Sequence, residues 1–169
     1  KQTIKERMAY GKALRATFPR SEQGDYQPAP NRVDPVSVLI AQAETRIQEL
    51  VPIRHARMLT SPFAFLRGAA AIMAADLAAS TKSTGIMVQA CGDMHVANFG
   101  VFASAERNLV FGINDFDETL PGPWEWDLKR LVASIVASGK YLAATDQQCK
   151  DFVLAAVKSY RNRMHEYAR

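Results

Sequence analysis

Two short polar stretches, CGDMHVANFG at residues 91–100 and INDFDE at residues 113–118, interrupt a chain otherwise rich in Ala, Leu and Val. Each is joined to an apolar run that favours a β-strand, IMVQAC at 86–91 and LVFGIN at 109–114. Polar side chains at the ends of strands lie where a scaffold can direct them toward a ligand. The two stretches therefore predict the centre of the fold and the position of a site.

The residues around these stretches predict a small β-region. NFGVFA and LVFGIN are separated by the polar turn SAERN, which predicts a β-hairpin. A hairpin returns the chain to its starting point, so Asn98 and Asp115 are expected to face one another. IMVQAC is expected to be a buried strand, and LPGP at 120–123 is interpreted as a turn.

Helical signals occupy most of the remaining chain. Asp34 before Pro35 predicts the N-cap of an amphipathic helix that reaches Leu50. Ser61-Pro62 predicts the start of one apolar core helix through residue 80. Two more helices are expected. One runs from the LPGP turn to about Gly139, and the other begins at a cap formed by Thr145 or Asp146 and reaches Tyr167. The predicted fold class is α+β, mostly helical.

Length and composition indicate one globular domain. The chain has 169 residues, of which 48% are hydrophobic and 22% charged, and so can bury a sizeable core. Cys91 and Cys149 are expected to be free thiols in a reducing compartment. No stretch has the length and apolarity of a secretory signal or a membrane span, so we expect a cytoplasmic protein without membrane contact.

The excess positive charge lies at the N-terminus. Six Lys or Arg residues and Glu6 give residues 1–20 a charge of +5, so the other 149 residues carry −1 of the net +4. We interpret residues 1–33 as a basic arm and extended linker, with order beginning at Asp34. A phosphate-binding arm is the alternative, but no aromatic stacking platform accompanies it, which argues against a nucleic-acid partner.

The polar residues of the two stretches have the chemistry of a hard-cation site. Asn98 and Asp115 offer oxygen atoms, and Mg²⁺ takes one or two carboxylates together with waters and substrate phosphates. Asp93 stays free of the metal and can accept a proton from a substrate hydroxyl, as phosphoryl transfer requires. The alternative is that Asp and Asn here only close loops.

The pattern Gly-Asp-x-x-x-x-Asn, a short hairpin and then Asp-Phe resembles the catalytic and metal loops of the protein-kinase-like superfamily, particularly its aminoglycoside and choline phosphotransferases. The resemblance implies that Asp93 is the catalytic base and that Asn98 and Asp115 hold Mg²⁺. It also implies that Asp127 braces the catalytic loop, for which backbone N–H groups would be suitable partners. The implied activity is transfer of phosphate from ATP to a small-molecule hydroxyl.

Three longer segments resemble the bacterial domain-of-unknown-function family 2252, placed among the kinase-like folds. They are SPFAFLRGAAAIMAADLA, CGDMHVANFGVFAS and NDFDETLPGPWEWDLKRL, and the resemblance covers about residues 33–140. It implies that residues 34–169 are a kinase-like catalytic half resembling a C-lobe, from a longer protein. Four further residues are accessory candidates for the site: Arg67, His95, Asp117 and Glu118.

Each accessory candidate has an alternative interpretation. His95 either bonds its own backbone or contacts a ligand, and Asp117 and Glu118 are either second metal ligands or solvated turn acids. Arg67 either neutralises the acidic site or is a core arginine that is paired or whose head reaches solvent. Trp124 and Trp126 are expected to pack within the fold, and a substrate-facing aromatic is the alternative.

The chain departs from the kinase pattern in ways that leave two other functions open. Asp-Phe-Asp replaces Asp-Phe-Gly, and no Gly-x-Gly pair is present to cover ATP phosphates. We expect a catalytic half without its nucleotide cradle, which binds ATP weakly. The alternatives are a non-catalytic kinase-like scaffold for a nucleotide or partner, and a binuclear metallophosphoesterase built on Asp93-x-His95.

Overall fold

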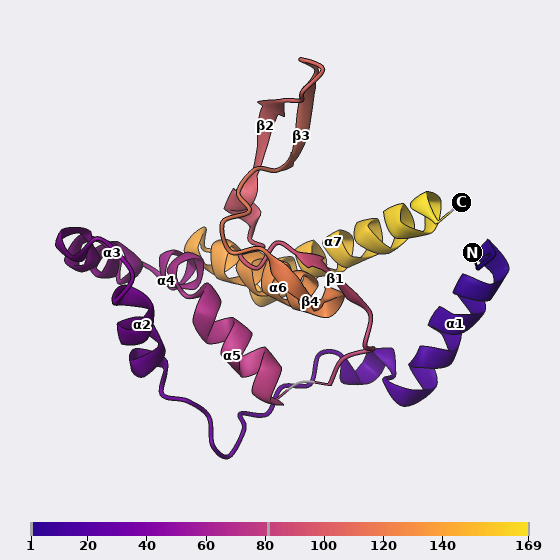
Figure 1. Ribbon diagram of the computed structural model, residues 1–169, viewed down its shortest axis with the longest axis horizontal. Helices are drawn as coiled ribbons and strands as arrows, with labels where there is room; N and C mark the ends of the chain where they lie inside the picture. The colour runs from indigo at the N-terminus through magenta and orange to yellow at the C-terminus, as the bar shows by residue number, and fades with distance from the viewer. Residues whose placement is uncertain (1, 81, 169) are drawn as a thin grey trace.

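The computed structural model describes residues 2–80 and 82–168, and the fold is α+β and mostly helical, as predicted (Figure 1). The helices are α1 (Ile4–Thr17), α2 (Pro35–Ala43), α3 (Val51–Met58), α4 (Pro62–Gly68), α5 (Ala70–Ser80), α6 (Trp124–Tyr141) and α7 (Asp146–Tyr167). Short 3-10 turns lie at Arg20–Glu22, Gln48–Leu50 and Val96–Asn98. The strands are β1 (Met87–Ala90), β2 (Phe99–Ala103), β3 (Leu109–Ile113) and β4 (Leu120–Pro123).

The predicted hairpin is present. Strands β2 and β3 pair antiparallel from Phe99 opposite Ile113 to Ala103 opposite Leu109. In Figure 1 the hairpin projects away from the helices, and its base carries the two polar stretches back toward α6. The hairpin therefore brings residues 98 and 114 together, where the backbone N–H of Asn114 donates to the carbonyl of Asn98 at 3.2 Å.

The turn predicted at 120–123 is instead strand β4. It pairs antiparallel with β1, from Met87 opposite Pro123 to Ala90 opposite Leu120. Proline is tolerated because β4 is an edge strand that needs hydrogen-bond partners on one side only. The expected burial of β1 is also wrong, because a two-stranded sheet covers little surface and only Ala90 of this strand is buried.

Sequence signals for helix starts are confirmed. The Asp34 carboxylate accepts from the backbone N–H of Ser37 at 2.8 Å, and Ser61 Oγ accepts from that of Ala64 at 3.0 Å. Thr145 caps α7 in a reciprocal arrangement with Gln148. These contacts satisfy N–H groups that have no partner within the helix.

Two predicted helices are shorter than expected. The helix that begins after Asp34 ends at Ala43, where the Gln48 side-chain amide donates to the carbonyls of Ala43 and Arg46 at 2.9 and 3.0 Å. Ile47, expected on its apolar face, is exposed. A side chain that binds the last carbonyls replaces the hydrogen bonds that further helix would have supplied.

The single core helix expected over residues 62–80 is two helices, α4 and α5, bent by 76°. Side chains distant in sequence bind carbonyls at the end of α4. Arg130 Nη2 donates to the carbonyl of Leu66 at 2.7 Å, and Arg54 Nη2 donates to that of Gly68 at 3.1 Å. Among the described residues no single helix is long and apolar enough to cross a bilayer; only this bent pair passes by length and composition.

The expectation that ordered structure begins at Asp34 is wrong, because helix α1 precedes this residue. Its N-cap, Thr3, forms a reciprocal capping box with Glu6. None of the α1 residues is buried, and the chain first becomes buried at Phe18, whose ring centre lies 5.9 Å from the ammonium of Lys129. The basic arm is therefore helical but lies outside the core.

Helix α6 is the central element of the fold. It contacts α4, α5, α7, β1 and β4, as its central place in Figure 1 shows. The ring of Trp124 stacks on that of Tyr160 in α7 at a centroid distance of 5.9 Å, which confirms a packing role for this tryptophan. A small separate core forms from Met58, Ala69 and Ile72, with Val38 and Leu39 packed against it.

Two glycines with positive φ allow a matched test of the turn that follows β1. Gly92 has φ +82° and a Cβ there would overlap the carbonyl oxygen of Glu118, whereas Gly85 has φ +76° and open space. We expect Gly85→Ala to cost about 1 kcal/mol, the strain of left-handed backbone. Gly92→Ala should cost at least about 2 kcal/mol more, because backbone must move. Urea unfolding followed by circular dichroism measures both; equal losses would contradict the contact.

Candidate functional site

Residues 91–98, which include the 3-10 turn Val96–Asn98, connect β1 to β2 and lie against α6. The two carboxylate oxygens of Asp127, in the first turn of α6, accept from the backbone N–H groups of Cys91 at 2.8 Å and Gly92 at 3.1 Å. These are the kind of partners expected for an inward-facing carboxylate. The start of the loop is thereby fixed to the helix.

The end of the same loop is fixed two turns further along α6. Ser134 is fully buried; its Oγ accepts from the backbone N–H of Val96 at 3.0 Å and donates to the carbonyl of Leu131 at 2.7 Å. Asp127, Arg130 and Ser134 are spaced i, i+3 and i+7, which places all three on one face of the helix. We call these three residues the polar stripe of α6.

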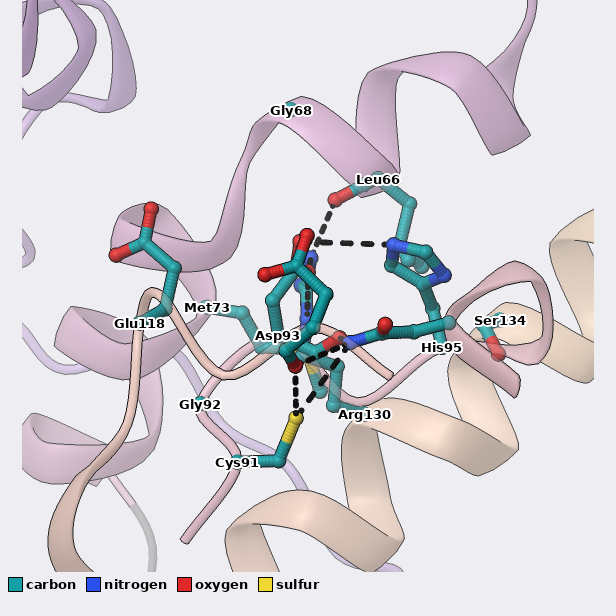
Figure 2. Close-up of polar contacts among 12 residues, drawn as sticks. Leu66, Gly68, Met73, Cys91, Gly92, Asp93, His95, Glu118, Arg130 and Ser134 are labelled. Atoms are coloured by element: carbon teal, nitrogen blue, oxygen red, sulfur yellow. Dashed lines mark hydrogen bonds and ion pairs between the residues drawn. The ribbon is translucent and has the colours of Figure 1, made fainter. Parts of the chain in front are cut away.

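Asp93 lies between the two anchored ends of the loop and is paired with Arg130 (Figure 2). Arg130 Nε donates to Asp93 Oδ1 at 2.9 Å, and Nη2 donates to the same oxygen. Burial by itself would raise the pKa of Asp93, but the hydrogen bonds from His95 and Arg130 outweigh it and hold that pKa below its usual value. Asp93 is therefore ionised at neutral pH.

His95 is buried beside Asp93, with its Nε2 3.5 Å from Asp93 Oδ2. Its ring meets that of Phe63 edge-on at 6.4 Å. The other ring nitrogen, Nδ1, is buried and has no hydrogen-bond partner among the described residues. The side chain therefore contacts the predicted base and forms no hydrogen bond with its own backbone.

Asn98 joins the two polar stretches. Its side chain is buried, and its Nδ2 donates to the carbonyl of Asp93 at 3.2 Å and to that of Asp115 at 3.0 Å. Cys91 Sγ also lies 3.5 Å from the carbonyl of Asp115. The amide nitrogen of Asn98 thus holds the turns of Asp93 and Asp115 together. The predicted hairpin does bring positions 98 and 115 close to each other.

The remaining acidic candidates are exposed. Asp115 Oδ1 accepts from the backbone N–H of Asp117 at 3.2 Å, and Glu118 Oε1 lies 3.8 Å from Arg46 Nη2. Together with Asp93, His95 and Asn98 they line one open cavity of about 970 Å³. Within residues 2–80 and 82–168, no three His, Cys, Asp or Glu side chains are placed to hold one metal ion.

Arginines from α3 and α4 line the same cavity. Arg54 and Arg57 belong to α3, and Arg67 lies in the last turn of α4. Arg67 is exposed to the cavity, so it is not a core residue. Each of these side chains is thus accessible from the space in front of the acidic loops.

Cys91 is a buried thiol rather than a nucleophile. Burial, with the nearby charge of Asp127, raises the pKa of the thiol above its usual value. A nucleophilic cysteine needs the thiolate, which this environment disfavours.

Sequence reasoning missed Arg130 and Arg54. Arg130 had a detectable signal, because it follows Asp127 by three residues and precedes Ser134 by four, so the charges and the hydroxyl share a face of a predicted helix. Arg54 had none, since its contact with the Gly68 carbonyl depends on how α3 packs on α4.

A family model describing an uncharacterized protein conserved in bacteria (DUF2252) matches residues 46–169. The match covers most of the chain and confirms the resemblance to that family. No curated protein and no solved structure matches the chain.

The pairing of Arg130 with Asp93 predicts a pH-dependent loss of stability. Replacing one partner of a buried ion pair leaves the other uncompensated, so we expect Arg130→Met to cost about 3 kcal/mol at pH 7. The pKa of Asp93 is lower in the folded state than in the unfolded state, where it is about 4. The ion pair therefore stabilises the fold fully above the unfolded pKa, and this stabilisation is lost as the pH falls through the folded-state pKa. The cost of Arg130→Met should therefore shrink in acid.

Chemical denaturation at a series of pH values measures this difference. Arg161→Met, at an exposed position of α7, is the control and should change stability by no more than about 0.5 kcal/mol. A cost for Arg130→Met that stays constant down to pH 3 would show that Asp93 is not its partner.

Proposed function

The chain belongs to the DUF2252 family, and we propose that its cavity is the metal-and-base half of a phosphotransferase. In this proposal ATP supplies a phosphoryl group to the hydroxyl of a small molecule. The observation that supports it is the side chain of Asn98, whose hydrogen bonds hold the turns of Asp93 and Asp115 beside one cavity.

The oxygen atoms of Asn98 and Asp115 fit a Mg²⁺ ion. Asn98 donates through Nδ2, and its amide oxygen accepts no hydrogen bond from the described residues. Asp115 Oδ1 accepts one backbone N–H, which leaves Oδ2 without a partner among them. Two protein oxygens suffice because Mg²⁺ retains several waters and takes substrate phosphate oxygens. When bound, it would neutralise negative charge on the transferred phosphoryl group.

Asp93 would orient the acceptor. Arg130 occupies Oδ1 twice, whereas among the described residues Oδ2 has only His95 at 3.5 Å and can accept a hydrogen bond from a hydroxyl. The acceptor oxygen would bond to the γ-phosphorus as the bond to the bridging oxygen breaks, ADP leaves, and the proton passes to Asp93. A depressed pKa makes Asp93 a weak base, which is tolerable because a loose transition state requires little help with proton removal.

The tight pairing of Asp93 also favours a second candidate, a kinase-like scaffold that binds nucleotide without transfer. A carboxylate held twice by a buried arginine can serve the fold alone, and the sequence has no Gly-x-Gly pair. The binuclear phosphoesterase has less support, since among the described residues no three His, Cys, Asp or Glu side chains could share an ion.

The metal role of Asp115 can be tested with Mn²⁺ as a paramagnetic substitute for Mg²⁺. Asp115→Asn removes a charged ligand at constant size, and we expect Mn²⁺ affinity, measured by water-proton relaxation, to fall at least about tenfold. Asp151→Asn, on the exposed surface of α7, makes the same chemical change away from the cavity and should bind as the wild type does. Equal affinity in all three proteins would remove Asp115 from the metal site.

Incubation with γ-labelled ATP and a pool of metabolites separates the three functions. A phosphotransferase moves label to a metabolite and loses this activity in Asp93→Asn. A scaffold binds nucleotide but moves no label. Steady hydrolysis of a generic phosphomonoester with Mn²⁺ and without ATP would favour the phosphoesterase.

A further inference from the structure

The cavity has a basic side that the proposed chemistry leaves without a role. Arg54 and Arg57 are three residues apart in α3 and therefore share one face of that helix. Arg67 joins them because α3 packs tightly on α4: a Cβ at Gly68 would overlap the side chain of Met58. We call Arg54, Arg57 and Arg67 the arginine side of the cavity.

The arginine side is not neutralised by the acidic loops. The same cavity is lined by four carboxylates, Asp93, Asp115, Asp117 and Glu118. Yet the guanidinium groups of Arg57 and Arg67 make no hydrogen bond or ion pair with any residue that the structure describes, and Glu118 lies near Arg46 instead. Positive and negative groups thus line one cavity largely unpaired with each other.

Arg54 shows that positive charge is crowded here. Its Nη2 is held by the carbonyl of Gly68, which fixes the guanidinium beside the last turn of α4. Burial, and next the charge of Arg46, lowers the pKa of Arg54 from its usual value, although the charges of Glu118 and Asp93 act in the opposite direction. An anion bound at this point would reduce the repulsion between the arginines. It would also accept hydrogen bonds from guanidinium N–H groups that have no partner among the described residues.

We propose that Arg54, Arg57 and Arg67 bind a phosphate group of a reactant in the cavity. Guanidinium groups suit this ligand because their planar donors match phosphate oxygens in pairs. The inference deepens the proposed function, because the bound group would belong either to the nucleotide or to an acceptor that already carries a phosphate. In both cases the phosphate lies between the arginines and the acidic loops that would hold Mg²⁺.

Inorganic phosphate, without metal and at low ionic strength, is the probe. We expect the Arg57→Ala/Arg67→Ala double variant to bind it at least about tenfold more weakly than the wild type by calorimetry. Both side chains are exposed and unpaired within the described chain, so the variant should unfold at the wild-type temperature.

Arg15→Ala/Arg161→Ala is the matched control, because it removes the same charge from exposed positions in α1 and α7. It should retain wild-type affinity. An equal loss in the control, unchanged affinity in the cavity variant, or no binding by the wild type would each overturn the proposal.

Two more arms separate this inference from the metal proposal and identify the source of the phosphate. Asp115→Asn should keep phosphate binding while it loses Mn²⁺, so failure of the metal site leaves the phosphate site standing. Displacement of phosphate by the magnesium complex of adenylyl imidodiphosphate assigns the site to the nucleotide. Simultaneous binding of the two assigns it to a phosphorylated acceptor.

Discussion

The structure depends on the hydrogen bonds between the polar stripe of α6 and the loop that follows β1. A charged or polar group inside a protein destabilises it unless it has partners. Asp127 and Ser134 find theirs in backbone N–H groups of the loop, and Arg130 finds its partner in Asp93. Without the loop Asp127 would lose both of these partners, and Arg130 would keep the Leu66 carbonyl but lose its carboxylate. The packing of α6 and the order of the loop therefore depend on each other.

The features that sequence predicted are local ones. The N-caps at Asp34, Ser61 and Thr145 follow from the residue and its neighbours three positions on. The β2–β3 hairpin follows from two β-prone runs around a polar turn. The contact of Asp127 with the loop is not local and is implied by the resemblance to kinase-like loops; the need of an inward carboxylate for N–H partners agrees with it. Nothing distant in the chain alters the caps or the hairpin.

The features that sequence missed depend on residues far apart in the chain. An apolar run through 62–80 predicts one helix. The structure shows why this helix ends early: Arg130 donates to the carbonyl of Leu66, and Arg54 donates to that of Gly68. The strand β4 exists because β1 lies beside it, and its prolines concealed it. The apolar spacing of α6 gives no role to Arg130, although the spacing of Asp127, Arg130 and Ser134 indicates a second, inward polar face.

Arg130 also links the two sides of the cavity. One guanidinium binds the carboxylate of Asp93 and, through Nη2, the carbonyl of Leu66, which precedes Arg67 in the last turn of α4. The break between α4 and α5 and the place of Asp93 are therefore set by the same buried side chain. If the arginine side binds a phosphate group and Asp93 orients a hydroxyl, Arg130 fixes the distance between the sites that hold these two groups. A residue buried beneath the cavity would thus position both, without touching either reactant.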